Sequence, residues 1–346
     1  MRIGIAGAGV LGRLAAFQLS RAGHHVTVFE SAPEPAPGPG RLRAAGWTAA
    51  GMLSPIAEME CGGPLVRDLG ERSLTLWQSI NEQLEVTSNI PAPLGLQLHD
   101  SLIVCHASDM GSAQRILRLL DNDPKKLIQL NANDVRQLAP EMKGTLHAWR
   151  LHGEGHLSPA LAMQSLLAAS LGVDWNWGNT VTQVSPHSII ANQIAHAFDL
   201  VLDTRGTGAA PEVSVRGVRG EVVVLHAPGF RLLRPVRLLH PRWRVYIVPH
   251  PEDRLVIGAT EIESEDRSPI SVQSTMELLS AAFSIFPALA EARIVHTDVN
   301  LRPATRDNLP YIAHEPGLLR INGLFRHGWL LAPAVLEKAL GDAGLC

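Results

Sequence analysis

The sequence predicts an α/β fold with a parallel sheet, into which a second domain of the α+β type, built on an antiparallel sheet, is inserted. The 346 residues are long for one domain and suit two interlocked ones. The first thirty residues alternate strand, turn, helix and strand, whereas residues 221–260 contain longer strands. A strand over 318–321 and a terminal helix from Pro333 then resemble a return to the first sheet, so the antiparallel region is expected to be an insertion.

The N-terminal unit reads as one strand–helix–strand motif. Residues 3–6 form an apolar strand, and apolar residues then recur at helical spacing up to Gly23, which suits a helix C-cap. A second strand over 25–29 ends at Glu30. Further helices are expected over 64–86, 111–121, 133–139, 159–171 and 272–286, and further strands over 96–105, 198–203, 221–226, 244–249, 255–260 and 294–301.

A glycine motif lies between the first strand and the first helix. Gly7-Ala8-Gly9-Val10-Leu11-Gly12 has the form G-x-G-x-x-G, and Glu30 stands at the end of the second strand. In a Rossmann-like domain such a turn brings backbone N–H groups at the helix N-terminus against a pyrophosphate, while the acidic residue accepts hydrogen bonds from a ribose. A plain glycine-rich turn would not require this whole context. The motif therefore predicts dinucleotide binding.

The same motif serves FAD and NAD, so other features must distinguish the two. The motif begins at the extreme N-terminus, and a glycine-containing segment over 323–333 is able to bring a second loop back to the same cofactor. Both features favour FAD. A nearly uncharged run over 44–52 follows a loop rich in proline and glycine, and such a run is expected to lie against something flat and buried. Plain core packing is the alternative interpretation of that run.

Composition limits the remaining classes. The formal net charge is −3 and there is no basic run, which argues against nucleic-acid binding. No apolar run approaches the roughly 18 residues of a membrane helix. Cys61, Cys105 and Cys346 match no metal-ligand spacing, so we expect no metal site and a cytoplasmic protein. The sequence leaves homo-oligomerisation open.

Four segments resemble the D-amino acid oxidase family of FAD-dependent oxidoreductases, and within it the glycine oxidases of thiamine biosynthesis, as a divergent branch. They span nearly the whole chain in the family's order. The segments are the N-terminal glycine motif; residues 49–53; residues 246–249 with 256–260; and residues 301–303 through 309–312 into 325–333.

This resemblance implies a Rossmann-like FAD domain and an antiparallel sheet that covers the flavin. It implies oxidation of a small amino acid or amine, such as glycine, sarcosine or a D-amino acid, with hydride passing from the α-carbon to flavin N5. Arg302 corresponds to the arginine that holds the substrate carboxylate, Tyr246 to the tyrosine beside it, and Arg326 to an arginine near the mouth of the active site. Met52 corresponds to a pocket residue next to the flavin.

Simple chemistry is compatible with these roles. The planar fork of an arginine is the best holder of a carboxylate, and hydride transfer needs orientation more than acid–base groups. The competing interpretations are an ordinary strand-end arginine at 302 and a core tyrosine at 246. None of the three cysteines lies in a flavin-facing motif, so noncovalent FAD is expected.

The resemblance also divides the chain and names the site. The FAD-binding domain is expected to comprise residues 1–85, 141–215 and 302–346, and the substrate-binding domain residues 86–140 and 216–301. The residues expected to contact FAD are Gly7, Gly9, Val10, Leu11, Gly12, Glu30, Arg41, Trp47, Thr48, Ala49, Ala50, Gly51, Met52, Val181, Gly206, Arg302, Arg326, His327, Gly328, Trp329 and Leu330.

Some positions depart from the family pattern. Residues 203–208 place Asp203 and Arg205 where the family has small residues, and Trp329 is bulky where smaller aliphatic residues are frequent. These departures leave three functions open: an oxidase that uses O2 and produces H2O2, a dehydrogenase that passes electrons to a quinone or carrier protein, and a flavoprotein that has lost turnover and serves as a maturation or partner protein.

Overall fold

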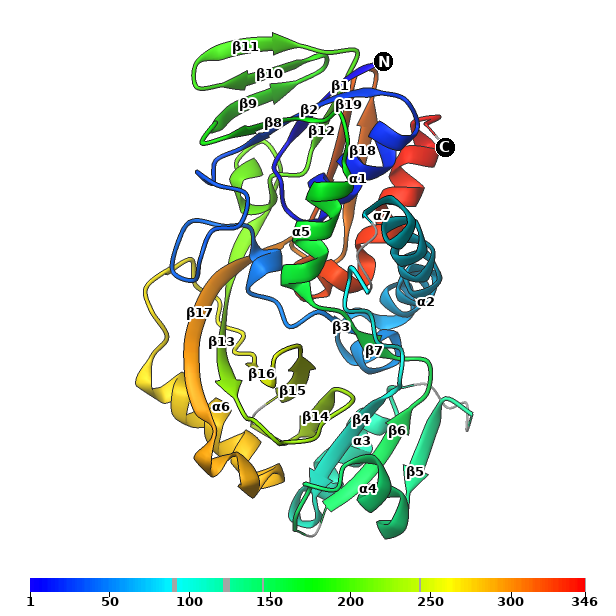
Figure 1. Ribbon diagram of the computed structural model, residues 1–346, viewed down its shortest axis with the longest axis vertical. Helices are drawn as coiled ribbons and strands as arrows, with labels where there is room; N and C mark the ends of the chain where they lie inside the picture. The colour runs from blue at the N-terminus through cyan, green and yellow to red at the C-terminus, as the bar shows by residue number, and fades with distance from the viewer. Residues whose placement is uncertain (89–91, 121–124, 145, 243, 346) are drawn as a thin grey trace.

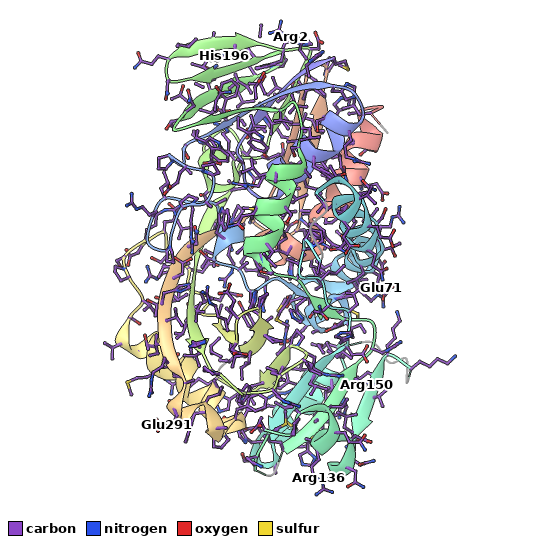
Figure 2. All side chains as sticks on the ribbon, in the orientation of Figure 1. Arg2, Glu71, Arg136, Arg150, His196 and Glu291 are labelled. Carbon is purple, nitrogen blue, oxygen red and sulfur yellow. The ribbon has the colours of Figure 1, made fainter. Side chains whose placement is uncertain are left out.

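Two large β-sheets organise the molecule, one towards each end of its long axis (Figure 1). The computed structural model describes residues 1–88, 92–120, 125–144, 146–242 and 244–345. Cys346 and the last residue of the helix expected over 111–121 lie outside the described residues. The labelled charged side chains of Arg136 and Glu291 lie at the periphery of the molecule (Figure 2).

The first sheet has six strands, and it contains both the N-terminal motif and the last strands of the chain. Each of its neighbouring strand pairs is parallel except the edge pair β18–β19. The expected strand–helix–strand unit and the return of the C-terminal strand to the same sheet are confirmed. In spatial order the strands are β18 (Tyr311–Glu315), β19 (Leu318–Asn322), β12 (Leu200–Asp203), β1 (Arg2–Ala6), β2 (His25–Glu30) and β8 (Asp174–Trp177).

Four helices pack with this sheet into the largest apolar core. Leu14 and Phe17 are fully buried there, as expected for one face of an amphipathic helix. Ser158 caps the fifth helix, since its hydroxyl accepts a hydrogen bond from the backbone N–H of Leu161, with Pro159 at the first helical position. The four are α1 (Val10–Arg21), α2 (Pro55–Ser88), α5 (Pro159–Ala169) and α7 (Gly328–Asp342).

The expected start of the terminal helix at Pro333 is wrong. The helix α7 begins at Gly328 and contains Pro333 in its interior. A proline at that position cannot donate to the carbonyl four residues earlier, which is that of Trp329. The indole N–H of Trp77 donates to this carbonyl at 2.8 Å instead, so the helix continues through the proline. The helix N-terminus therefore lies five residues earlier than the sequence suggested.

The second sheet has eight strands and is antiparallel apart from the pair β14–β4. Its longest strands pair along most of their length and form the tall curved ribbon in Figure 1. In spatial order the strands are β17 (Arg293–Ala304), β13 (Arg216–His226), β16 (Arg254–Gly258), β15 (Arg244–His250), β14 (Val236–Leu239), β4 (Ser101–His106), β6 (Leu146–Leu151) and β5 (Leu127–Leu130).

The two faces of this sheet have different tasks, as the alternation along β13 shows. Val223 and Leu225 belong to the core that packs beneath helix α6 (Val272–Ile285), whereas Val222 and Val224 pack with Ala50 on the opposite face. Alternate residues of a strand point to opposite faces, so one strand serves both. The second face looks towards the six-stranded sheet.

Smaller elements complete the chain. The helix expected over 111–121 is shorter in the structure, the helix expected over 133–139 is displaced by one residue, and several short strands were not expected. The smaller elements are the helices α3 (Met110–Leu117) and α4 (Ala132–Leu138), the strand pair β3 (Met52–Leu53) and β7 (Gly155–His156), the meander β9 (Val181–Ser185), β10 (Ser188–Ala191) and β11 (Ile194–Ala197), and the 3-10 turns η1 (Ala45–Trp47), η2 (Ala107–Asp109), η3 (Gly206–Ala209), η4 (Pro287–Glu291) and η5 (Phe325–His327).

The sheet order refines the expected domain boundaries. Strand β6 falls in the segment 141–215, which we assigned to the FAD domain, yet it pairs within the eight-stranded sheet. We therefore propose that the boundary lies after Leu151. None of the described helices is long and apolar enough to cross a membrane.

Candidate functional site

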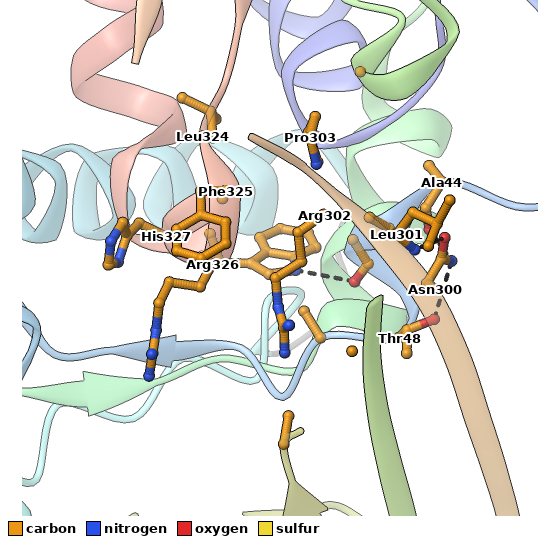
Figure 3. A pocket seen from close by; sticks show the side chains of 18 of the residues that line it. Ala44, Thr48, Asn300, Leu301, Arg302, Pro303, Leu324, Phe325, Arg326 and His327 are labelled. Atoms are coloured by element: carbon orange, nitrogen blue, oxygen red, sulfur yellow. Dashed lines mark hydrogen bonds between the residues drawn. The ribbon is translucent and has the colours of Figure 1, made fainter. Parts of the chain in front are cut away.

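A cavity of about 730 Å³ lies where the two sheets meet. The glycine turn before α1, the segment 42–52 and the turn 204–208 line it from the side of the six-stranded sheet. Residues of β13, β15 and β17 line it from the eight-stranded sheet, and residues 321–330 close it at the start of α7 (Figure 3).

Most of the expected site residues meet in this cavity although they come from distant parts of the chain. The catalytic candidates Tyr246, Arg302 and Arg326 all line it. The expected cofactor residues that line it are Gly7, Gly9, Val10, Leu11, Glu30, Thr48, Ala49, Ala50, Gly51, Met52, Gly206, Arg302, Arg326, His327, Gly328, Trp329 and Leu330.

Four expected residues do not line the cavity. Gly12 lies inside α1, Arg41 is exposed in the loop between β2 and η1, and Val181, the first residue of β9, packs against a small apolar cluster. Trp47 packs beside Arg13, whose guanidinium carbon is 5.4 Å from the centre of its ring. That cation–π contact gives the ring of Trp47 a partner within the protein.

The glycine turn fits a pyrophosphate. A Cβ on Gly7 would approach the carbonyl oxygen of Thr204 to 2.9 Å, and one on Gly12 would lie 1.9 Å from the carbonyl oxygen of Gly7. The backbone of the protein itself therefore leaves no room for a side chain at these two positions. A Cβ on Gly9 would meet only the side chain of Ala44, at 3.5 Å, so its absence leaves open space towards the cavity. The first turn of α1 has no side-chain cap, which suits N–H groups that bind an anion.

Glu30 secures this turn as well as lining the cavity. Its carboxylate accepts hydrogen bonds from the backbone N–H of Ala8 at 2.7 Å and of Ala32 at 2.9 Å. The acidic residue thus couples the end of β2 to the glycine turn. A carboxylate has about four acceptor positions, so capacity remains for a ribose hydroxyl.

The charged residues at 203–208 neutralise one another. Arg205 donates to both carboxylate oxygens of Asp203, at 2.9 and 2.7 Å, and to Glu212 at 2.7 Å. The expected charge beside the cofactor is therefore an internal ion-pair cluster, and Gly206 follows it at the cavity wall.

Arg302 is a half-buried cation held by neutral groups. Its guanidinium donates to the carbonyl oxygens of Thr260 at 2.9 Å and Arg219 at 3.3 Å. Burial lowers its pKa from the usual value. A Cβ on Gly220 would lie 2.5 Å from the guanidinium carbon, so this glycine of β13 makes room for the charge. Among the ion pairs of the described residues, Arg302 has no carboxylate partner.

Tyr246 lies close to this group on the neighbouring part of the sheet. A Cβ on Gly258 would approach its ring and its hydroxyl oxygen to 2.7 Å, so a second glycine provides the space for this side chain. Burial raises the pKa of Tyr246, while the charge of Arg302 acts in the opposite direction. The hydroxyl therefore stays protonated at neutral pH and is able to donate.

The opposite wall carries a carboxylate that the sequence analysis missed. Glu58, on the first turn of α2, forms ion pairs with Arg237 and with Arg326 at 3.1 Å, and its carboxylate lies 3.1 Å from Nδ1 of His327. Burial alone would raise the pKa of Glu58, but these three neighbours hold it well below the usual value. Arg326 also pairs with Glu261 at 3.0 Å. The one sequence signal was an acidic residue shortly after the uncharged run.

The remaining candidates for chemistry are few. Cys61 and Cys105 are free thiols, and burial raises the pKa of both. Within the described residues there is no group of three side chains suited to a metal ion.

The comparisons with known proteins agree with this geometry. Residues 2–337 match the model of the family described as FAD dependent oxidoreductase. The chain is 35% identical to a putative thiamine biosynthesis oxidoreductase ThiO of Rhizobium etli, over 97% of this chain and 94% of that protein. It is 29% identical to a glycine oxidase of Geobacillus kaustophilus, over 96% of this chain and 89% of that protein.

The fold agrees too. The crystal structure of glycine oxidase from Geobacillus kaustophilus superposes with a TM-score of 0.84 and 26% identity, and covers 99% of this chain and 94% of that one. A glycine oxidase from Bacillus cereus superposes with a TM-score of 0.83 at 23% identity, over 99% and 95% of the two chains. From its sequence and its fold alike, the chain belongs to the D-amino acid oxidase family of FAD-dependent oxidoreductases.

Proposed function

We propose that this enzyme oxidises a small amino acid, such as glycine, sarcosine or a D-amino acid, and passes the electrons to O2, which becomes H2O2. The observation that carries the proposal is the state of Arg302. It is a guanidinium inside the cavity whose hydrogen bonds go to two backbone carbonyls and whose charge no ion pair with a described residue balances. A carboxylate that enters the cavity would supply the missing negative charge.

Tyr246 supports the same substrate class. Its protonated hydroxyl is able to donate to the same carboxylate, and the two glycines at 220 and 258 are what allow both side chains to occupy their places. FAD, when bound, supplies the acceptor for the hydrogen and electrons of a C–H bond beside nitrogen. The task of the protein is then to hold the α-carbon in one orientation, which two donors on one carboxylate do well.

The relatives point to the same chemistry. Two of the curated proteins that this chain resembles over most of their lengths are named glycine oxidases. The difference between the candidate substrates depends on the rest of the cavity lining around the carboxylate anchor, which includes Met52 and Glu58. We propose that this part of the cavity accepts a small side chain or an N-methyl group of the substrate.

The test uses purified flavoprotein without oxygen. Glycine, sarcosine and D-alanine should each be mixed with it and compared with methylamine and ethylamine, which carry the amine without the carboxylate. The proposal expects the flavin absorption band to bleach with at least one amino acid and not with the matched amines. Admission of air should then restore the band and yield H2O2.

Two results would change the proposal. Bleaching by the amines alone would remove the role of Arg302 as carboxylate anchor. Bleaching by an amino acid that air does not reverse, but that a quinone does, would instead make the enzyme a dehydrogenase.

A further inference from the structure

Two polar residues precede Arg302 on strand β17 at every second position. Asp298 and Asn300 are 4% and 7% exposed, and strand β17 pairs with β13 without irregularity from 297 to 304. Because side chains alternate along a strand, these two residues point to the same side of the sheet as Arg302, towards the cavity. A buried carboxylate and a buried amide on that side need partners.

Their partners lie in the segment Arg43 to Met52, which forms one wall of the cavity. The carboxylate of Asp298 accepts hydrogen bonds from the guanidinium of Arg43 and from the hydroxyl of Thr48. The amide of Asn300 donates to the carbonyl of Arg43 at 3.2 Å, the carbonyl of Ala44 at 3.4 Å and the hydroxyl of Thr48 at 3.1 Å (Figure 3). The side chain of Thr48 is thus both donor and acceptor in one network.

The other end of the segment is held by different residues. The ring of His250 on β15 bonds the carbonyl of Ala50 at 2.9 Å, and the backbone N–H of Leu157 donates to the carbonyl of Gly51 at 2.9 Å. Between these points, residues 44–46 and 48–52 line the cavity. The conformation of this wall therefore depends on β17 at one end. At the other end it depends on β15 and on the connection between β7 and α5.

We propose that Asp298 and Asn300 are positioning residues for the FAD site. They hold the segment 43–52 in a fixed register with Arg302, so that one strand aligns the wall against which the flavin lies with the group that anchors the substrate. Neither residue needs to touch the cofactor or the substrate to do so. The proposal concerns FAD binding, and it stands whichever substrate the enzyme takes.

The test compares the two faces of β17 by substitution. Asp298→Asn keeps the shape but removes the charge that balances Arg43, and Asn300→Ala removes the donor to the segment. Val299→Ala is the matched control, because it changes the same strand from the opposite face. Apoprotein of each variant is titrated with FAD, with the flavin fluorescence and the visible spectrum as readouts, and the melting temperature is measured with and without FAD.

We expect Asp298→Asn and Asn300→Ala to raise the Kd for FAD by about tenfold or more, as for the loss of one charge-assisted hydrogen bond, and to shift the flavin absorption band. Val299→Ala should lower the melting temperature while the Kd and the spectrum stay those of the wild type. Wild-type Kd and spectrum in both polar variants would overturn the proposal, even if their melting temperatures fall.

Thr48 provides a second route should Asp298→Asn not fold. Thr48→Val removes the hydroxyl and should weaken FAD binding, whereas Thr48→Ser retains the hydroxyl and should recover most of the affinity that Thr48→Val loses. Combining Thr48→Val with Asn300→Ala should weaken FAD binding by less than the sum of the two single changes, because both remove the hydrogen bond between Asn300 and Thr48. Full additivity would overturn the coupling. Substrate turnover is not measured in this test, so its failure is distinct from a failure of the proposed function.

Discussion

The two arginines of the cavity differ in what surrounds them. Arg302 projects from the eight-stranded sheet and bonds two backbone carbonyls, whereas Arg326, at the start of α7, is paired with Glu58 and Glu261. The guanidinium of Arg302 is therefore available to a ligand, whereas that of Arg326 is already paired with carboxylates of the protein. The partners of a guanidinium in a cavity thus decide whether it can bind a ligand. Arg302 is suited to bind, and Arg326 to hold the second wall together.

Replacing Arg302 is expected to have the largest effect on activity. Removal of one partner of a buried charge pair costs about 3–5 kcal/mol. At about 1.4 kcal/mol per tenfold, Arg302→Ala should lower kcat/KM for amino acids by roughly two to three and a half powers of ten. Arg302→Lys should restore only part of this, because an ammonium group cannot form the two parallel bonds of the guanidinium fork. Steady-state kinetics on glycine, sarcosine and D-alanine provide the measurement.

The control for this prediction is an amine without a carboxylate. Any slow turnover of such an amine should be nearly equal in the wild type and in Arg302→Ala. Normal turnover of every amino acid by Arg302→Ala would make Arg302 a structural residue and would remove the distinction between the two walls.

Replacing Glu58 should instead affect stability. Glu58→Gln leaves Arg237 with an uncompensated buried charge and Arg326 with Glu261 alone. We expect a loss of about 3 kcal/mol in the free energy of unfolding, measured by urea denaturation. Glu337→Gln, which breaks the exposed pair with Arg72, is the control and should have little effect. If Glu58→Gln has the stability of the wild type, the second wall is not held together by charge.

Tyr246→Phe tests the contribution of the neighbouring hydroxyl. A hydrogen bond to a charged group contributes about 1.5–3 kcal/mol, so kcat/KM should fall by about 10- to 150-fold. The fall should be smaller than that for Arg302→Ala and should again be confined to substrates with a carboxylate. An equal loss for amines would show that Tyr246 acts on the reacting centre rather than on the anchor.

The last prediction concerns how the buried rings of His156 and His250 make stability depend on pH. Burial lowers the pKa of His156 to about 3 and that of His250 to about 4, compared with about 6.5 in an unfolded chain. Between pH 6.5 and 4 the unfolded state therefore binds more protons at these sites, and stability falls as the pH falls. Each histidine contributes a slope of about 1.4 kcal/mol per pH unit.

Glu154 opposes this trend. Burial raises its pKa to about 7, so below that pH the folded state binds the extra proton and gains stability as the pH falls towards the usual pKa of a glutamate. His156→Gln should flatten the decline of the unfolding free energy between pH 6.5 and 4.5 by about one proton's slope. The exposed His152→Gln is the control. Equal slopes in wild type and His156→Gln would mean that His156 titrates normally in the folded protein.

The elements that the sequence predicted correctly are those with a local signature. The glycine motif, the strand before it and Glu30 lie within thirty residues, and each position is required by its neighbours in the chain. The helix expected over 159–171 belongs to the same category, because Ser158 caps it and Pro159 occupies its first position. The start of α7 was misplaced because a proline normally ends a helix, and only the indole of Trp77, about 250 positions away, compensates for it.

The sequence by itself determined the family, the cofactor motif and the residue types of the anchor that we propose for the substrate. These depend on side chains that are close in sequence or that match a known pattern. The tertiary structure alone decided which of two arginines remains without a carboxylate, and that Asp298 and Asn300 hold the segment that begins at Arg43. The physical reason is that an ion pair is defined by distance in space. Partners separated by more than 200 positions leave no trace in the local pattern of the chain.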